Sequence, residues 1–280
     1  MCYKDNINDQ LLLEQKYWVN HILREYIEKD NPSFTYDGES QKRKNKNQVL
    51  SHPFYMGLSD EYLNCENGKR IMVVGREAMG FGKINDGTAE YDFIKTIQSD
   101  KGKKSTNEPS NSQKWAIAYF NKQVNKSYDE LPECYDEIDS NSSSFWNFFR
   151  LLKEHNFKSC WNNVDKVYFE TTLSYNAEEI LSKPYEKDGK YMSLLQREIE
   201  FAAPNIVLFV TGEEYFKSIF TALQLEKKVH APVPEKNDKC LVKIAEIDGI
   251  RYYWCDHPQG LTAKGFKKQD ILNYIVNKLK

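Results

Sequence analysis

Residues 71–82 constrain the fold of this chain more than any other stretch, because an apolar strand runs there directly into a glycine-rich turn. The letters are IMVVGREAMGFG. Four apolar residues without a polar interruption are typical of a strand covered on both faces, as in a parallel sheet. Glycines let the backbone turn sharply and approach a ligand closely. Ligands of open α/β sheets bind outside the carboxyl ends of the strands, so Glu77 stands where chemistry usually occurs. The alternative is a plain turn with a solvated Arg76–Glu77 pair.

The remaining sequence repeats the order strand, loop and helix, which predicts an α/β fold with a mainly parallel sheet. Apolar residues at helical spacing predict helices at 10–29, 88–98, 113–126, 145–154, 192–202, 213–223 and 267–279. Further strands are predicted at 166–173 and 206–210, and a hairpin at 240–247 and 250–255 around an Asp-Gly turn. Three predicted strand ends carry Glu77, Glu170 and His257. Because parallel strands end at one edge of a sheet, we expect these three side chains to converge.

Composition limits the classes of protein to consider. With 280 residues and a net charge of −2, the chain has no global basic field, so any DNA contact must come from local patches. The six cysteines form no CxxC pair, which argues against a zinc ribbon or iron–sulfur cluster. The polar start and the lack of a run of about 20 apolar residues predict a cytoplasmic protein outside the membrane. We expect one domain, 1–280, with a helical extension over about 1–65.

Four separated motifs resemble those of the uracil-DNA glycosylase superfamily. Residues 75–78 (Gly-Arg-Glu-Ala) are similar to its first catalytic motif, and 167–174 to the strand that ends in its base-reading Asn. Residues 208–212 resemble its third strand, which ends in Gly. Residues 257–261 (His-Pro-Gln-Gly-Leu), with Lys-Gly-Phe at 264–266, are similar to its His-Pro-Ser-Pro-Leu motif. The resemblance implies a three-layer sandwich around a central, mainly parallel four-stranded sheet.

The resemblance also implies that the chain flips a base out of DNA and hydrolyses its N-glycosidic bond. Glu77 would stabilise the sugar cation and orient or deprotonate the attacking water. His257 would donate a hydrogen bond to the base carbonyl as negative charge accumulates there. The implied enzyme is a monofunctional, monomeric hydrolase without metal or cofactor. No Lys stands in a motif as a Schiff-base nucleophile.

Other motif residues have implied binding roles, each with a simpler structural alternative. Met79 and Phe81 would wall the base pocket, or pack the turn. Leu261 would fill the vacated base stack, or pack in the core. The residues expected to hold phosphates are Gly260, Gly212 and Lys264, with Arg76 as a further candidate.

Departures from the family pattern bear on the base that is recognised. Ala78 replaces a Pro, and Glu77 is longer than the usual Asp or Asn. Glu170 stands in the slot of the base-reading Asn, and an ionised carboxylate only accepts hydrogen bonds. It would suit the exocyclic amine of a cytosine-type or modified base better than uracil, which would fit defence against phage DNA. A register shift of one residue would put Thr171 in that slot instead.

Two other functions remain open from the sequence. One is a catalytically inactive module that keeps the fold and binds nucleic acid or a nucleotide, and another is conventional uracil-DNA repair. A nucleotide-binding α/β enzyme ranks last, because the chain lacks both GxGxxG and GxxxxGK[ST].

Overall fold

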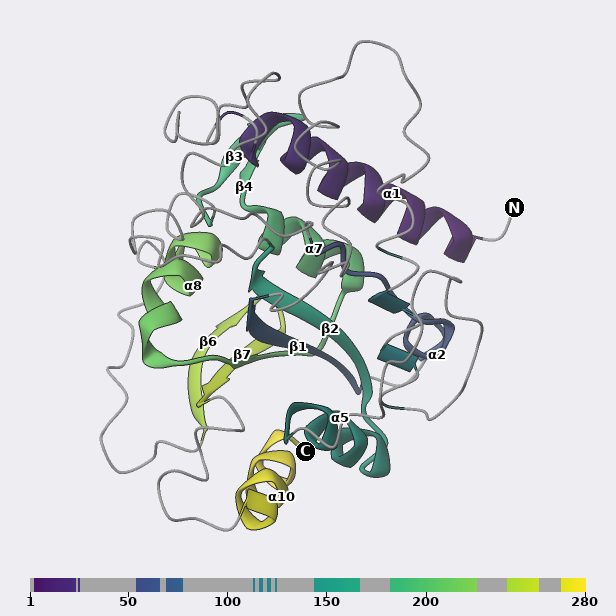
Figure 1. Cartoon of the computed structure of the whole chain (residues 1–280), viewed down its shortest axis with the longest axis vertical. Helices are drawn as coiled ribbons and strands as arrows, with labels where there is room; N and C mark the ends of the chain where they lie inside the picture. Colours follow the sequence, from purple (N-terminus) through teal and green to yellow (C-terminus); the bar gives the residue numbers. More distant parts are fainter. Residues whose placement is uncertain are drawn as a thin grey trace, which may run out of the picture.

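A five-stranded sheet with helices against both faces forms the centre of the protein (Figure 1). The computed structural model of the chain describes residues 3–23, 25, 54–65, 69–77, 113, 116–117, 120–121, 124, 144–166, 182–225, 241–256 and 268–280. The predicted α/β class with a mainly parallel sheet is confirmed.

The strand order in the sheet is β2-β1-β5-β7-β6. The bounds are Lys158–Asp165 for β2, Arg70–Glu77 for β1, Ile206–Val210 for β5, Ile250–Cys255 for β7 and Val242–Ile247 for β6. The first four are parallel, and β6 alone runs antiparallel, beside β7. The expected four strands are therefore corrected to five, because the predicted Asp-Gly hairpin adds its first strand to the edge of this sheet. Asp248 and Gly249 both have positive φ, as a two-residue hairpin turn of this kind needs.

The two faces of the sheet are covered by separate apolar clusters. In β1, Met72 and Val74 belong to one cluster and Ile71 and Val73 to the other, as alternation along a doubly covered strand requires. The first cluster includes residues from α1 (Tyr3–Trp18), α2 (Asp60–Leu63), α7 (Leu194–Ala202) and α8 (Phe216–Leu223). The second includes residues from α5 (Ser144–Glu154) and α10 (Lys268–Leu279). Figure 1 shows α1, α7 and α8 on one side of the strands, with α5 and α10 on the other.

The helix α7 leads into the central strand β5 and has a well-defined start and end. The Ser193 hydroxyl accepts from the backbone N–H of Gln196 at 3.0 Å, and the Gln196 side chain accepts from the backbone N–H of Ser193 at 3.0 Å. This reciprocal capping box satisfies two N–H groups that the first turn would otherwise leave unpaired. Ala203 adopts a left-handed conformation after the last turn, and its backbone N–H donates to the carbonyl of Ile199.

The N-terminal helix is part of the core and not only an appendage. It begins at Tyr3, earlier than predicted, and continues after Trp18 into a π-helix, η1 (Val19–Leu23). Of the predicted range 10–29, residues 24 and 26–29 lie outside the described part. Leu11 is fully buried in the cluster that covers the sheet.

The strand predicted at 166–173 is not the parallel neighbour of β1. That neighbour is β2, which ends at Asp165, and Lys166 lies in a bend directly after it. Residues 167–173 lie outside the described part. The segment 158–165 (KSCWNNVD) lacks an apolar run because it buries two asparagines, Asn162 and Asn163, whereas 166–173 is richer in β-branched and aromatic residues.

A short antiparallel hairpin was not predicted. It consists of β3 (Tyr185–Lys187) and β4 (Lys190–Met192), joined by Asp188-Gly189, both with positive φ. The Asp-Gly pair is the same signal that identified the β6–β7 hairpin. The strands around it have only three residues each, too few for alternation to show.

We expect Leu11→Ala to lower the free energy of unfolding by about 2–5 kcal/mol, because it leaves a cavity in the core. Leu13→Ala is the matched control on the same helix, since its side chain is 65% exposed; we expect a change within about 0.5 kcal/mol. Urea unfolding of both variants measures the difference. Equal stability of the two would show that α1 does not pack on the sheet as described.

Candidate active site

The candidate site lies at the carboxyl edge of the parallel strands. The register pairs Glu77, the last residue of β1, with Asp165, the last of β2. It likewise pairs Val210, the last residue of β5, with Cys255, the last of β7. The chain passes from β1 to β2 on one side and then to β5 on the other, so the reversal of strand order lies between β1 and β5. In open α/β sheets, ligands bind at such a point.

An ion pair joins the ends of β1 and β5 at this point. Arg76 Nη2 lies 3.4 Å from Glu214 Oε1, and the two side chains are 40% and 39% exposed. Glu214 belongs to the single 3₁₀ turn η4 (Glu213–Tyr215) that follows Gly212. A methyl group on Gly212 would lie only 2.0 Å from Glu214 Oε2, so the glycine makes room for this carboxylate. The guanidinium also lies 6.0 Å from the centre of the Tyr215 ring.

Asn163 provides a buried amide close to the end of β2. Its Oδ1 accepts from Trp161 Nε1 at 3.1 Å, and the register places it beside Gly75 of β1. A methyl group on Gly75 would lie 2.7 Å from that Oδ1 and 3.6 Å from the Phe145 ring. Asn163 Nδ2 is buried and has no hydrogen-bond acceptor among the residues that the structure describes. A buried amide donor without an acceptor is the kind of group that a ligand carbonyl can satisfy.

A second polar cluster, the Lys166 cluster, lies at the end of the same strand and consists of Lys166, Glu198, Asn162 and Gln15. Lys166 Nζ lies 2.6 Å from Glu198 Oε2, and the side chains are 4% and 0% exposed. Asn162 Nδ2 donates to the same carboxylate oxygen at 3.0 Å, and Lys166 Nζ donates to Asn162 Oδ1. Gln15 Nε2, from α1, donates to Glu198 Oε1 at 2.9 Å. The cluster thus joins α1, β2 and α7.

Burial lowers the pKa of Lys166, because removing an ammonium group from water disfavours its charged form. The neighbouring carboxylates of Glu198 and Asp165 act in the opposite direction and favour the charged form. The backbone carbonyl of Lys166 also accepts from the Phe54 N–H at 2.6 Å. This residue is therefore held by both its side chain and its backbone immediately beyond β2.

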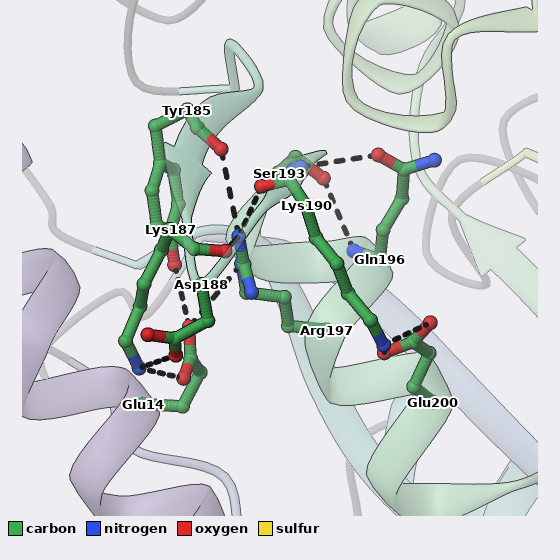
Figure 2. A network of polar contacts seen from close by, with 9 residues as sticks. All are labelled: Glu14, Tyr185, Lys187, Asp188, Lys190, Ser193, Gln196, Arg197 and Glu200. Carbon is green, nitrogen blue, oxygen red and sulfur yellow. Dashed lines mark hydrogen bonds and ion pairs between the residues drawn. The ribbon is translucent and has the colours of Figure 1, made fainter.

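A second network joins the same two helices to the β3–β4 hairpin (Figure 2). Glu14 of α1 forms ion pairs with Arg197 Nε of α7, at 3.2 Å, and with Lys187 Nζ of β3. The Tyr185 hydroxyl donates to Glu14 Oε1 at 3.2 Å. Arg197 Nη2 donates to the carbonyl of Lys190 at 2.9 Å. Because Glu14 and Gln15 are adjacent on α1, and Arg197 and Glu198 on α7, the two networks lie side by side.

The structure describes only part of the predicted site. The backbone of Glu77 ends β1, but its side chain is not described, and Arg76 and Gly212 lie together near Glu214. The predicted residues outside the described part are Met79, Phe81, Glu170, Thr171, His257, Gly260, Leu261 and Lys264. Their convergence stays a prediction. In the sequence, His257 follows the last residue of β7 by two positions.

Sequence reasoning missed Asn163, Glu214 and the Lys166 cluster. Nothing in the sequence marks Asn163 as buried, because asparagines are typical of turns and exposed positions. No signal in the sequence links Lys166 to Glu198 or Gln15.

Neither metal-binding groups nor membrane spans occur among the residues that the structure describes. No three His, Cys, Asp or Glu side chains there lie close enough together to hold a metal ion. No helix in the same part of the chain has the length and apolar character needed to cross a bilayer.

We expect Lys166→Met to destabilise the protein by about 3–5 kcal/mol, because it leaves the Glu198 carboxylate buried without its cation. Glu198→Gln removes the anion and keeps only one of the two contacts with Gln15 and Asn162, because both of these side chains donate and the new amide nitrogen cannot accept. The double variant should lose much less stability than the sum of the two single variants, since neither buried charge is left alone. Urea unfolding of the unmodified protein, the two single variants and the double variant measures the coupling free energy between Lys166 and Glu198. Additive losses would contradict a direct ion pair.

Comparison of the chain with models of protein families, with curated proteins and with solved structures found no match.

Proposed function

We propose that the chain is a DNA glycosylase, a monofunctional hydrolase that cleaves the N-glycosidic bond of a flipped-out base. The observation that carries the proposal is the common edge of the parallel strands. Glu77 ends β1, Gly212 follows β5 by two residues, and His257 follows β7 by two residues in the sequence. Three of the four family-like motifs thus belong to neighbouring or next-neighbouring parallel strands, at the same end of each.

The proposed chemistry needs one carboxylate and one hydrogen-bond donor. Breaking the bond leaves positive charge on the sugar and negative charge on the departing base. Glu77 would stabilise the sugar cation and orient the attacking water, and His257 would donate to the base carbonyl. Water supplies the hydroxyl group to the sugar carbon and its proton to the base, so no metal or cofactor takes part in this scheme.

The base is proposed from the donor and acceptor groups beside the edge. The Oδ1 of Asn163 is taken by Trp161, so its Nδ2 would donate to a carbonyl oxygen of the flipped base. Uracil and cytosine both have a ring carbonyl oxygen, so this amide suits either base. The amine-bearing cytosine-type base remains the proposal that follows from Glu170, and a phage-defence role belongs with that choice.

DNA binding would rest on local contacts, since the net charge of the chain is −2. Met79 and Phe81 would wall the base pocket, and Leu261 would fill the vacated stack. The proposed phosphate contacts are Gly260, Lys264, Gly212 and Arg76.

The second function is a catalytically inactive module that keeps the fold and binds nucleic acid or a nucleotide. Arg76, a cation that the structure describes between β1 and β5, is paired with Glu214. This pairing weakens phosphate binding by an enzyme and by a module alike, so it does not separate the two functions. Measuring base release separately from DNA binding distinguishes the two functions.

We expect Glu77→Gln to reduce base release by at least about 100-fold while leaving DNA binding nearly unchanged, because the amide cannot act as base or anion. The assay detects abasic sites in duplexes that contain uracil, cytosine, hydroxymethylcytosine or glucosylated hydroxymethylcytosine. Glu200→Gln, a change of the same chemistry in the exposed Lys190–Glu200 pair, is the control. DNA binding without base release by the unmodified protein would favour the inactive module.

The two proposed base-reading residues predict different changes in base release. Asn163→Asp keeps the acceptor for Trp161 but removes the Nδ2 donor, so release of uracil and of cytosine-type bases should both fall if Asn163 contacts the base carbonyl. Glu170→Asn should shift preference from cytosine-type bases toward uracil if Glu170 reads it. The same set of duplexes measures both variants. Unchanged release of every base by both variants would exclude both residues as readers.

A further inference from the structure

We propose that Glu214 is an internal competitor for the DNA backbone, holding Arg76 in the free protein and giving it up to a phosphate group on binding. The inference depends on the proposed function in one respect, namely that the partner is DNA. It concerns regulation of the same edge and is independent of which base is released, or whether one is.

The Arg76–Glu214 contact has the geometry of an ion pair in which another anion can replace the carboxylate. The Glu214 carboxylate approaches one nitrogen of the guanidinium, Nη2, at 3.4 Å. That distance is longer than the 2.7–2.9 Å typical of strong charge-assisted hydrogen bonds. Both side chains are more than one third exposed, so solvent and an incoming phosphate can reach them. Exposed ion pairs of this kind contribute little to stability, about 0–1 kcal/mol, and are therefore easily exchanged.

The surroundings hold Arg76 in place when the carboxylate leaves. Its guanidinium lies over the Tyr215 ring, and its Nε is buried without an acceptor among the described residues. The terminal nitrogens of this 40% exposed side chain can donate to a ligand that brings more oxygens than one carboxylate. A phosphate can accept two parallel hydrogen bonds from Arg, which one carboxylate oxygen at 3.4 Å does not.

Gly212 makes room for the Glu214 carboxylate beside Arg76. The Glu214 carboxyl group lies where the side chain of any other residue at position 212 would begin. It therefore lies against the backbone that follows β5, on the same side as Arg76. A ligand phosphate that contacts Arg76 and the Gly212 backbone would need this volume, so the carboxylate and the phosphate exclude each other.

The test compares Glu214→Gln with Glu213→Gln, which makes the same change in net charge at the neighbouring, exposed residue. The probe is a fluorescent duplex without a target base, titrated with each protein at several salt concentrations. Glu214→Gln should raise affinity by up to about fivefold, because the exposed ion pair that DNA must otherwise break is worth at most about 1 kcal/mol. The slope of log K against log salt should stay nearly unchanged, because Arg76 contacts the phosphate in both complexes. Glu213→Gln should change neither the affinity nor the slope.

The variant Arg76→Gln tests whether Arg76 is the cation that Glu214 holds. In that background, Glu214→Gln should no longer raise affinity beyond the effect of Glu213→Gln. Equal gains from the two glutamate variants, or a gain that persists without Arg76, would overturn the inference. Thermal unfolding confirms that each variant is folded, which we expect because the pair is exposed.

The outcomes separate this inference from the proposed glycosylase. Stronger DNA binding by Glu214→Gln without base release by any variant would support the internal competitor and refute the enzyme. Base release by the unmodified protein, with no gain in DNA affinity from Glu214→Gln, would support the enzyme and refute the internal competitor. Absence of DNA binding by every variant would refute both.

Discussion

The buried ion pair between Lys166 and Glu198 is the interaction on which the described end of the sheet most depends. Removing two charges from water costs several kcal/mol each, and their attraction compensates only if further hydrogen bonds satisfy both groups. Asn162 bridges the two charges, and Gln15 binds the other carboxylate oxygen. Gln15 lies on α1, Glu198 on α7 and Asn162 on β2, and Lys166 lies directly after β2. The pair can therefore form only when α1, β2 and α7 are all in place.

The same requirement explains why α1 belongs to the fold. Its residues Glu14 and Gln15 point into two adjacent networks on α7, one centred on Arg197 and one on Glu198. The first network reaches the β3–β4 hairpin through Lys187, as Figure 2 shows, and the second reaches the end of β2. Two neighbouring side chains on each helix thus fix the rotation of one helix against the other. Apolar packing alone would allow small rotations, whereas paired buried charges allow one arrangement.

Local pattern predicted those parts of the fold that local physics determines. β1 and β5 are apolar runs covered on both faces, the Asp-Gly turn specified the β6–β7 hairpin, and α10 shows helical spacing. β2 was misplaced by eight residues, because its buried Asn162 and Asn163 give it a polar composition. Those asparagines are tolerated only through partners distant in sequence, such as Glu198, and no window of sequence contains both members of such a contact. The position of Glu77 at a strand end followed from pattern, whereas the pairing of Arg76 with Glu214 did not.

The charges at the carboxyl edge have a common feature that bears on function. Both cations that the structure describes there, Arg76 and Lys166, are paired with carboxylates of the chain itself. Lys166 is buried and its pair cannot exchange with a ligand without local unfolding, so its role is to hold the end of β2. Arg76 is half exposed, and its pair can exchange. If a nearly neutral protein binds a polyanion, it gains affinity from few contacts, so each exchangeable pair has a large effect on how strongly it binds. The burial of the two pairs thus divides one edge of the sheet into a fixed part, which sets geometry, and a part whose ion pair is open to exchange.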